Sequence, residues 1–509
     1  MLAKILSSAL VGIEAYIVEV EIDIAQGLPS FTTVGLAEGA VRESKERVKA
    51  AVKNSGYHFP SDRITVNLAP ADIKKEGTAF DLPIALGILV ATGLVKKTDI
   101  KAYLFFGELA LDGLLRPVKG VLSMAITARE KGFKGIFLPL ENAVEASAVE
   151  GIEIYPLRTF SQLIEILQGS SPHSPFKKND TYSSFSNNYD IDFLDVRGQE
   201  NAKRAMEIAA AGGHNVIMTG PPGSGKTMLA KRFPTILPTL SFDEALETSR
   251  IYSVLGQMPK DHSLIKIRPF RAPHHTISYA GLIGGGQYPR PGEVSLAHNG
   301  VLFLDELPEF RKNVIEVLRQ PMEDDQVTIS RANSTASYPA KFMLLAAMNP
   351  CPCGFSGDSK RRCTCSDNQI QRYRAKISGP LMDRIDIHIE VPTVQFKDLT
   401  SNDNGKSSSE IIERVIRTRK IQHERFKRMK IYTNANMNSR QIRQFCNIDQ
   451  QAQNLLENAM NKFGLSARAH ARILRIARTI ADLEGCQEIK THNVAEAIQY
   501  RTLDRKTFN

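Results

Sequence analysis

Two motifs constrain this chain more than any other feature. Residues 220–227 read Gly-Pro-Pro-Gly-Ser-Gly-Lys-Thr, and residues 301–306 read Val-Leu-Phe-Leu-Asp-Glu. The first fits G-x-x-x-x-G-K-[ST], the pattern of a loop that wraps the phosphates of a nucleotide. The second is typical of a strand buried on both faces that ends in two acids. With a further strand expected at 215–219, just before the loop, the sequence predicts a parallel α/β sheet that binds a nucleoside triphosphate.

Each residue type in these motifs suits that chemistry. The residues expected to contact the nucleotide are Gly220, Pro221, Pro222, Gly223, Ser224, Gly225, Lys226 and Thr227. The glycines let the backbone curl so that several N–H groups face the phosphates. Lys226 is expected to reach the β- and γ-phosphates of ATP, and Thr227 and Asp305 to hold Mg²⁺. Glu306 is expected to act on the attacking water. The alternative is a glycine-rich turn that resembles the motif by chance.

Composition restricts the class of protein. The chain has 509 residues, 42% hydrophobic, as expected of a soluble globular protein of about three domains. No apolar run approaches the ~20 residues that a membrane-spanning helix needs. Near the N-terminus, Glu14, Glu19, Glu21 and Asp23 alternate with apolar residues, which is typical of a strand and not of a signal peptide. We therefore expect a cytoplasmic protein with no membrane association.

The net charge of +10 is concentrated near the C-terminus. Residues 401–509 contain 20 Lys and Arg against 11 Asp and Glu, and 411–430 is the densest part. A polyanion such as nucleic acid is the natural partner of a basic surface of this kind. The alternative is a solvated helix face with no partner.

The distribution of apolar and polar residues divides the chain into blocks. Residues 1–168 alternate strand and helix signals, 169–190 are a flexible linker rich in Ser, Asn and Pro, and 191–398 carry the nucleotide motifs. Residues 399–509 begin with a polar break and are helical by period. The predicted fold class is α/β, with an N-terminal α+β domain, a parallel-sheet core with hairpin insertions, and a C-terminal helical lid.

Several elements follow from the apolar periodicity. Strands are predicted at 16–24, 64–68 and 342–348, helices at 38–54 and 81–92, and two short strands within 326–341. An apolar stripe runs through Ile473, Ile476, Ala477, Ile480 and Leu483. The arginines that are expected to lie largely off this stripe are Arg468, Arg472, Arg475 and Arg478.

Four of the six cysteines are clustered in a loop at 350–366. They are Cys351, Cys353, Cys363 and Cys365. Two C-x-C pairs in a loop with glycines and a proline suit a tetrahedral Cys₄ zinc site. Four thiolates leave no open coordination position, so the expected Zn²⁺ is structural. A redox switch and unliganded thiols are the alternatives, while disulfides do not suit a reducing cytosol.

The whole chain resembles the AAA+ ATPases, and more narrowly the bacterial YifB/ComM group of magnesium-chelatase-like proteins. The layout is also similar to that of the MCM helicases. The stretches that carry the resemblance are Asp195-Val196-Arg197-Gly198-Gln199, Arg271-Ala272-Pro273-His274-His275, Gly284–Gly286 and Pro291–His298.

The resemblance implies further site residues. Gln199 would contact the nucleotide, and Asn349 would be the polar sensor beside the γ-phosphate. Arg384 would be the arginine finger given to a neighbouring subunit, which implies a ring, most simply a homo-hexamer. Arg468 would be a second sensor in the lid. A late guanidinium stabilises the phosphoryl transition state, but Arg384 and Arg468 could each be an ordinary ion-pair residue.

In this family a hairpin at 326–341 points into the pore of the ring. Arg331 and Lys341 flank its tip and could contact DNA phosphates. The alternative is a surface hairpin with no partner. His274 and His275 could line the pore too, or be half-buried structural residues.

The N-terminal block looks like the Lon protease domain, through Gly107–Gly120 and Gly135–Pro139. The serine of a Lon-type Ser-Lys dyad falls on Ala79, and the lysine falls near Leu122. Without a nucleophile and its base there is no acyl transfer. The block is closer to the proteolytically silent Lon-like domain of the RadA proteins.

Three functional hypotheses follow. The first, implied by the family, is an ATP-driven hexameric DNA motor or helicase that promotes branch migration in homologous recombination and natural transformation, on single-stranded or branched DNA. The second is a chelatase-type motor that remodels a metal-insertase partner. The third is a DNA-bound scaffold in which ATP controls only assembly.

Overall fold

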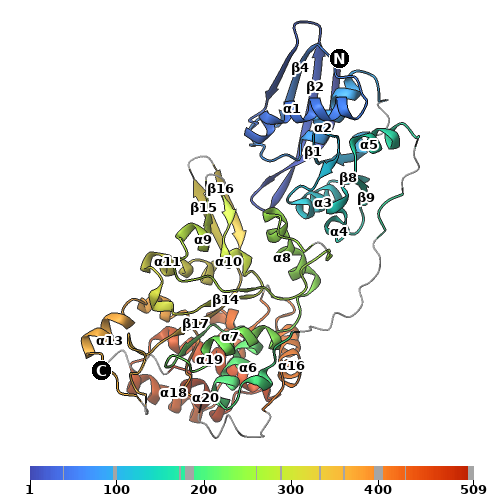
Figure 1. Cartoon of the computed structure of the whole chain (residues 1–509). Helices are drawn as coiled ribbons and strands as arrows, with labels where there is room; N and C mark the ends of the chain where they lie inside the picture. Colours follow the sequence, from blue (N-terminus) through green and yellow to red (C-terminus); the bar gives the residue numbers. More distant parts are fainter. Residues whose placement is uncertain are drawn as a thin grey trace. The chain divides into compact units, whose positions relative to one another are not determined.

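The computed structural model (Figure 1) describes residues 1–37, 39–95, 100–170, 174–177, 189–259, 261–286, 289–331, 334–358, 361–394, 405–429 and 431–501. The chain forms two compact units. Unit 1 comprises Met1–Ser184, Ser241–Lys266 and Ser330–Tyr338, and unit 2 comprises Phe185–Leu240, Ile267–Ile329 and Pro339–Asn509. Each unit has its own apolar core. No described helix is both long enough and apolar enough to cross a bilayer.

Unit 1 contains a four-stranded sheet of order β1-β2-β4-β3 and a parallel sheet of order β5-β8-β9. Its strands are β1 (Leu2–Val11), β2 (Glu14–Ala25), β3 (Ser30–Val34), β4 (Arg63–Ala69), β5 (Tyr103–Phe105), β6 (Glu108–Leu109), β7 (Leu115–Arg116), β8 (Gly135–Pro139) and β9 (Glu153–Leu157). Its main helices are α1 (Gly39–Asn54), α2 (Asp81–Ala91), α3 (Val121–Glu130), α4 (Ala143–Ala146) and α5 (Phe160–Leu167). Every residue of α2 is buried, which explains its nearly uninterrupted apolar sequence.

A segment from the middle of the chain also belongs to unit 1. Helix α8 (Phe242–Leu255) follows the phosphate-loop region in sequence, yet packs on α3. Arg250 donates to Ser123 Oγ at 3.2 Å and to Ile13 O at 3.0 Å, and pairs with Glu14. The N-terminal unit is therefore completed by residues far downstream.

Unit 2 is built on a five-stranded parallel sheet of order β11-β14-β17-β10-β18. The strands are β11 (Phe270–Arg271), β14 (Val301–Leu304), β17 (Met343–Met348), β10 (Val216–Thr219) and β18 (Ile387–Glu390). All residues of β10 and β14 are buried. The hairpins are β12 (Gly284–Gly285) with β13 (Arg290–Pro291), and β15 (Gln326–Arg331) with β16 (Ser334–Pro339). Because the five strands of the sheet are parallel, their carboxyl ends meet at one edge.

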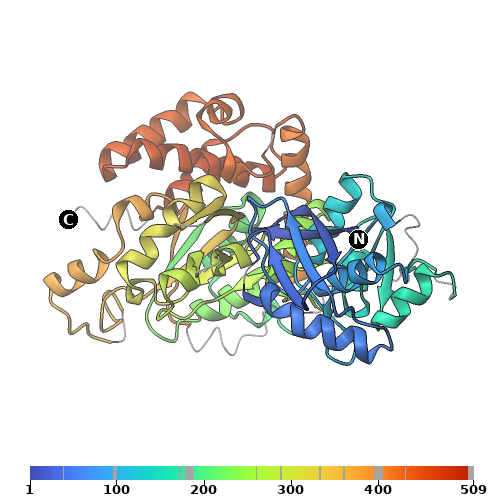
Figure 2. The ribbon, with the colours of Figure 1, turned by 90° about the horizontal axis from the view of Figure 1, so that it is seen from above.

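Helices surround this sheet, and the C-terminal ones gather on one side of it (Figures 1 and 2). The helices of unit 2 that precede the C-terminal ones are α6 (Glu200–Gly212), α7 (Lys226–Arg232), α9 (Tyr279–Ile283), α10 (Glu293–Leu296), α11 (Lys312–Glu316), α12 (Pro321–Asp324), α13 (Asp367–Arg374) and α14 (Gly379–Met382). The C-terminal helices are α16 (Ser408–Phe426), α17 (Ser439–Phe445), α18 (Gln450–Phe463), α19 (Ala467–Leu483) and α20 (Thr491–Gln499). Arg419 of α16 donates to Ala210 O at the end of α6, at 2.7 Å, which fixes the lid to the core.

The predicted elements are confirmed where the structure describes them. The strands at 16–24, 64–68, 215–219, 301–304 and 342–348 correspond to β2, β4, β10, β14 and β17, and the helices at 38–54 and 81–92 to α1 and α2. Most of the linker at 169–190, and part of the break at 401–410, lie outside the described residues. Arg478, predicted to lie off the apolar stripe, is nevertheless buried, and its guanidinium pairs with Asp482 at 3.0 Å.

Candidate functional site

The carboxyl edge of the unit 2 sheet brings the predicted nucleotide residues together. The phosphate loop, residues 220–227, follows β10, Asp305 and Glu306 follow β14, and Asn349 follows β17. β17 lies between β10 and β14, so the sensor position is between the loop and the acids. Motifs that are far apart in the sequence therefore lie next to one another at this edge of the sheet.

Lys226 is held on the inner side of the phosphate loop. Its Nζ donates to Gly220 O at 2.7 Å, to Pro221 O at 2.9 Å and to Asn349 Oδ1 at 3.3 Å. Burial lowers the pKa of this lysine, while Asp305 and Glu306 act in the opposite direction. An anionic phosphate would add to the attraction of those acids and stabilise the charged ammonium.

The loop depends on its glycines at two kinds of position. Gly223 and Gly225 have φ of +76° and +89°, which L side chains rarely adopt. A Cβ at Gly220 would lie 2.1 Å from Val391 O, so the backbones of the loop and of the segment after β18 approach too closely for a side chain. The Gln199 side chain links the loop to the segment after β18, because its Nε2 donates to Ser224 O at 2.7 Å and to Pro392 O at 2.9 Å. The side chain of Gln199 therefore holds the backbone of the phosphate loop.

The two magnesium candidates are already in contact. Thr227 Oγ1 donates to Asp305 Oδ2 at 2.7 Å, so a hydroxyl and a carboxylate share one point at the sheet edge. Such hard oxygen ligands suit Mg²⁺. Asp305 Oδ1 also accepts the backbone N–H of Glu306 at 3.0 Å, which orients the carboxylate.

Glu306 projects beyond this pair. Its backbone is left-handed, with φ of +52°, and it is 56% exposed as a side chain. His275 Nδ1 lies 3.6 Å from Glu306 Oε2. From the sequence, His275 was expected to be either a pore residue or a half-buried structural one, and its contact with Glu306 was not predicted. The histidine follows β11, the neighbour of β14 in the sheet, and this strand order is known only from the tertiary structure.

Arg384 lies away from the phosphate loop of its own chain. It is 8% exposed, pairs with Glu323, and donates to Pro380 O at 2.6 Å. It also lines a pocket of about 380 Å³ with residues of α9, α12 and β15. In the single chain, Arg384 is therefore an ion-pair residue.

Arg468 lies at the start of α19. Its guanidinium is 65% exposed and is 3.5 Å from Asp383 Oδ2, next to Arg384 in sequence. Each of the two arginines expected at the nucleotide thus pairs with an acid. Arg468 pairs with Asp383, and Arg384 pairs with Glu323 of α12.

A buried network joins the lid to the sheet. Asp386 pairs with Arg472 of α19, accepts the backbone N–H of Asn215 at 3.1 Å, and lies 3.6 Å from His214. Burial opposes ionisation of Asp386, but Arg472 and His214 lower its pKa well below the usual range. Asp386 was not predicted as a site residue. It joins the segment before β18 to helix α19.

The predicted DNA residues sit on and beside the β15–β16 hairpin. Arg331 is exposed at the end of β15. Lys341 follows β16, and its Nζ lies 4.7 Å from the ring centre of Tyr432, a cation–π contact. Residues 332 and 333 of the tip are outside the described part of the chain.

Much of the basic charge in α16 is internal to the fold. Arg414 pairs with Glu207 at 2.5 Å, Arg419 binds a backbone carbonyl of α6, and Arg425 pairs with Asp482 at 2.5 Å. Arg417 and Lys420 are exposed. The basic density of 411–430 therefore overstates the charge that this helix offers to a polyanion.

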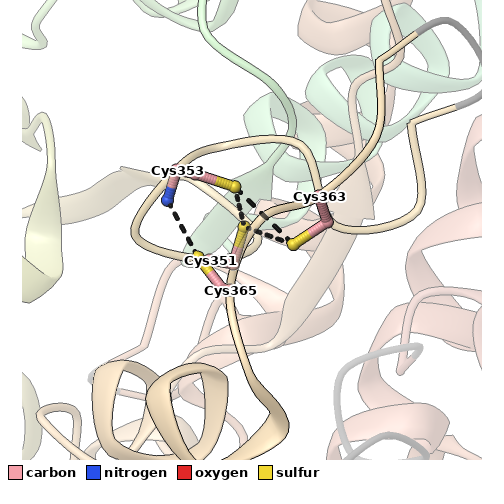
Figure 3. Close-up of side chains that lie close together, drawn as sticks. All are labelled: Cys351, Cys353, Cys363 and Cys365. Atoms are coloured by element: carbon pink, nitrogen blue, oxygen red, sulfur yellow. Dashed lines mark hydrogen bonds between the residues drawn. The ribbon is translucent and has the colours of Figure 1, made fainter.

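The four clustered cysteines converge (Figure 3). Their sulfur atoms all lie within 4.8 Å of one another, with Cys351 Sγ 3.3 Å from Cys353 Sγ and 3.7 Å from Cys363 Sγ. Backbone N–H groups of Thr364 and Phe355 lower the pKa of Cys353 to about 5. Four sulfurs from two C-x-C pairs at this spacing can hold a tetrahedral metal ion.

In unit 1 the Lon-like dyad positions are apolar. Ala79 and Leu122 are both buried. Close to Ala79, Asp81 binds Arg47 through two hydrogen bonds of 2.8 and 3.0 Å. Burial raises the pKa of Asp81 to about 6, and Arg47 opposes that shift. Asp81 and Arg47 therefore satisfy each other, and Ala79 and Leu122 themselves carry neither a nucleophile nor a base.

Comparison with known proteins gives a consistent result along the chain. The pattern of the family described as "Magnesium chelatase, subunit ChlI" matches residues 192–399, "Subunit ChlI of Mg-chelatase" matches 20–142, and its C-terminal pattern matches 405–501. The chain is 44% identical to "Competence protein ComM" of Haemophilus influenzae (strain ATCC 51907 / DSM 11121 / KW20 / Rd), over 99% of this chain and 98% of that protein.

Two further relatives are similar to this chain, one over nearly its full length and one over less than a third of it. The chain is 42% identical to protein YifB of Escherichia coli (strain K12), over 98% of this chain and 96% of that protein. With "Lon protease 2" of Bacillus subtilis (strain 168) it shares 27% identity over 30% of each chain. Full-length identity of this extent, together with the α/β core and its helical C-terminal region, confirms the predicted family: the chain belongs to the YifB/ComM family of magnesium-chelatase-like AAA+ proteins.

Proposed function

We propose that this chain is an ATPase that works as a ring-shaped DNA motor. The observation that carries the ATPase part is the single constellation at the sheet edge, in which Lys226 contacts Asn349 and Thr227 contacts Asp305. Residues that follow β14 and β17 meet there with the phosphate loop, which follows β10. A P-loop ATPase needs the same set of groups.

The roles follow from the geometry. Lys226 would bind phosphate oxygens, and Thr227 and Asp305 would hold Mg²⁺, which neutralises phosphate charge when bound. Glu306 would orient the attacking water and accept its proton, and its high exposure leaves it accessible. Asn349 would donate to the γ-phosphate through its amide.

The ring is part of the proposal because of Arg384. Its ion pair with Glu323 lies outside the nucleotide site of its own chain. A finger that acts on a neighbour's ATP would leave this pair when subunits assemble, most simply as a homo-hexamer. Arg468 would act as the lid sensor after leaving Asp383.

DNA is the proposed load, either single-stranded or branched. The support is the name of the relative, "Competence protein ComM", the exposed Arg331 and the net charge of +10. From these we infer branch migration in homologous recombination and natural transformation, in the cytoplasm.

The experiment is the ATPase rate of the full chain with no DNA, single-stranded DNA, duplex and a four-way junction, at two salt concentrations. We expect stimulation by DNA that weakens with salt, because salt competes with phosphate contacts. A Glu306→Gln variant serves as the hydrolysis-deficient control. Equal rates under all four conditions would reject the DNA motor.

A chelatase-type motor acting on a protein partner is the second candidate, favoured by the match of 192–399 to the magnesium chelatase pattern. It predicts an ATPase that does not respond to DNA. A DNA-bound scaffold predicts that Glu306→Gln keeps function, whereas either motor predicts that it assembles and loses function.

We also propose that the four cysteines bind a structural Zn²⁺. Their sulfur cluster suits a tetrahedral ion with no open position. Metal analysis of protein purified without chelators tests this, and full reaction of all four thiols with a thiol reagent in native protein would argue against it.

A further inference from the structure

The cysteine cluster lies directly against the nucleotide site. Cys351 is fully buried and is separated from Asn349 by Pro350 alone. Asn349 Oδ1 in turn accepts a hydrogen bond from Lys226 Nζ at 3.3 Å. Cys351 is therefore linked through Pro350 to the residue that contacts Lys226.

A second contact joins the cluster to the phosphate loop. Gly354 has φ of +86°, and a Cβ at this position would lie only 2.6 Å from Pro222 Cδ. Pro222 belongs to the loop that wraps the phosphates. The backbone of Gly354 thus lies so close to Pro222 that a side chain at this position would collide with the loop.

Hydrogen bonds to the cysteines shape the turn that contains Gly354. The N–H of Gly354 donates to Cys351 O at 3.0 Å, and the N–H of Ser356 donates to Cys351 Sγ at 3.3 Å. The N–H of Cys353 donates to Cys365 Sγ at 3.4 Å. The turn that presents Gly354 to Pro222 is therefore built around the sulfur atoms.

The segment after the last cysteine also contacts Pro350, the residue between Asn349 and Cys351. Ser366, next to Cys365, caps the N-terminus of α13, and Arg374 at the end of α13 donates to Pro350 O at 3.4 Å. Among the described residues of 352–366, none has a buried side chain, so this loop has no apolar core of its own. Four metal–sulfur bonds would supply the rigidity that burial does not.

We propose that the Cys₄ centre, loaded with a thiophilic ion of the Zn²⁺ class, is a positioning element of the nucleotide site. It holds Asn349 through Pro350, and the phosphate loop through the contact between Gly354 and Pro222. Loss of the metal releases both and weakens nucleotide binding and turnover. This inference rests on the proposed ATPase and zinc assignments, and is independent of whether the load is DNA.

Two glycines of the same loop provide a matched pair of variants. Gly354 and Gly357 both have left-handed backbones, with φ of +86° and +81°. A Cβ at Gly354 meets Pro222, whereas a Cβ at Gly357 meets nothing within 4 Å. Gly354→Ala and Gly357→Ala therefore impose similar backbone strain and differ in the contact with the phosphate loop.

The measurements are zinc content by elemental analysis, affinity for a fluorescent ATP analogue, and ATPase rate without DNA. We expect Gly354→Ala to retain zinc while its affinity or rate falls by about 10- to 100-fold, the range typical of changes around a functional site. Gly357→Ala should keep zinc, affinity and rate. Cys363→Ser should lose zinc and nucleotide affinity together, with Cys486→Ser as the control.

Chelation of the wild-type protein, followed by addition of ZnCl₂, covers the case in which a variant fails to fold. Affinity for the analogue should fall with the zinc and return with it. Zinc loss with unchanged affinity in a protein of unchanged circular dichroism would overturn the coupling, and so would wild-type protein without zinc. A zinc-dependent ATPase that ignores DNA would refute the DNA motor and leave the coupling intact.

Discussion

The carboxyl edge of the unit 2 sheet and the Lon-like face of unit 1 use polar residues in opposite ways. At the edge, Asp305 and Thr227 are in exposed contact with each other, and Glu306 is half exposed. In unit 1, Asp81 is only 1% exposed as a side chain and is fully engaged by Arg47. Polar groups that act on a substrate must remain available to it, whereas structural ones are stabilising only when their partners satisfy them.

The comparison predicts that changes at the nucleotide edge lower turnover and not stability, and that changes in the Asp81 pair do the reverse. The largest effect is expected for Arg384→Ala, a residue that lies outside this edge in its own chain and is proposed to reach the nucleotide edge of a neighbouring subunit. If the guanidinium acts on a neighbouring ATP, its loss should lower the ATPase rate by about 10³-fold or more. Arg372→Ala, an exposed arginine on α13, is the control.

A mixing measurement separates action in trans from action in cis. Arg384→Ala subunits keep the phosphate loop, and Lys226→Ala subunits keep the finger. A mixed ring that acts in trans should recover part of the ATPase activity that each variant lacks. Absence of any recovery in rings shown to be mixed would contradict the trans finger.

Glu306→Gln is expected to have the next largest effect. The amide can no longer accept a proton from the attacking water, so the turnover should fall by about 10²- to 10⁴-fold. Affinity for ATP and the melting temperature should stay within error, as measured by analogue binding and calorimetry. A large change in melting temperature would contradict the prediction that this edge affects turnover and not stability.

In unit 1, Arg47→Met should destabilise the fold by about 3 kcal/mol, because it leaves a buried carboxyl without its cation. Local hydrogen exchange in α2 would report the loss, with ATPase activity retained. Lys45→Met is the control, since Lys45 forms only an exposed pair with Glu46. Lost ATPase with unchanged exchange would reverse the assignment of the two regions.

The loss of stability caused by Arg47→Met should depend on pH in a predictable direction. Burial raises the pKa of Asp81 to about 6, above its value in an unfolded chain, so its contribution to stability falls as pH rises between those two values. Below its pKa the carboxyl is neutral and needs no cation. The destabilisation by Arg47→Met should therefore be larger at about pH 7.5 than at about pH 5.

The smallest effects are expected at the hairpin, which the division of the chain assigns to both units. Arg331 falls in unit 1 and Lys341 in unit 2. Replacing either with alanine should reduce the salt dependence of DNA binding by about one unit of slope if it contacts a phosphate. Lys101→Ala, an exposed lysine elsewhere, should leave the slope unchanged. Unchanged slopes for both hairpin variants would favour the hairpin without a partner.

Local sequence determined a large part of this protein. The strand at 216–219, the phosphate loop after it and the strand at 301–304 were predicted to within about one residue, because apolar period and glycine placement act over short distances. The convergence of four sulfurs also followed from spacing.

Tertiary structure alone decided which polar groups pair and which segments pack together. It placed Arg384 against Glu323 and Arg414 against Glu207, and it assigned 241–266 to the N-terminal unit. It also brought Gly354 against Pro222. These contacts join residues far apart in the chain, and they leave no periodic signal, because a single charged or small residue is compatible with many partners until the fold selects one.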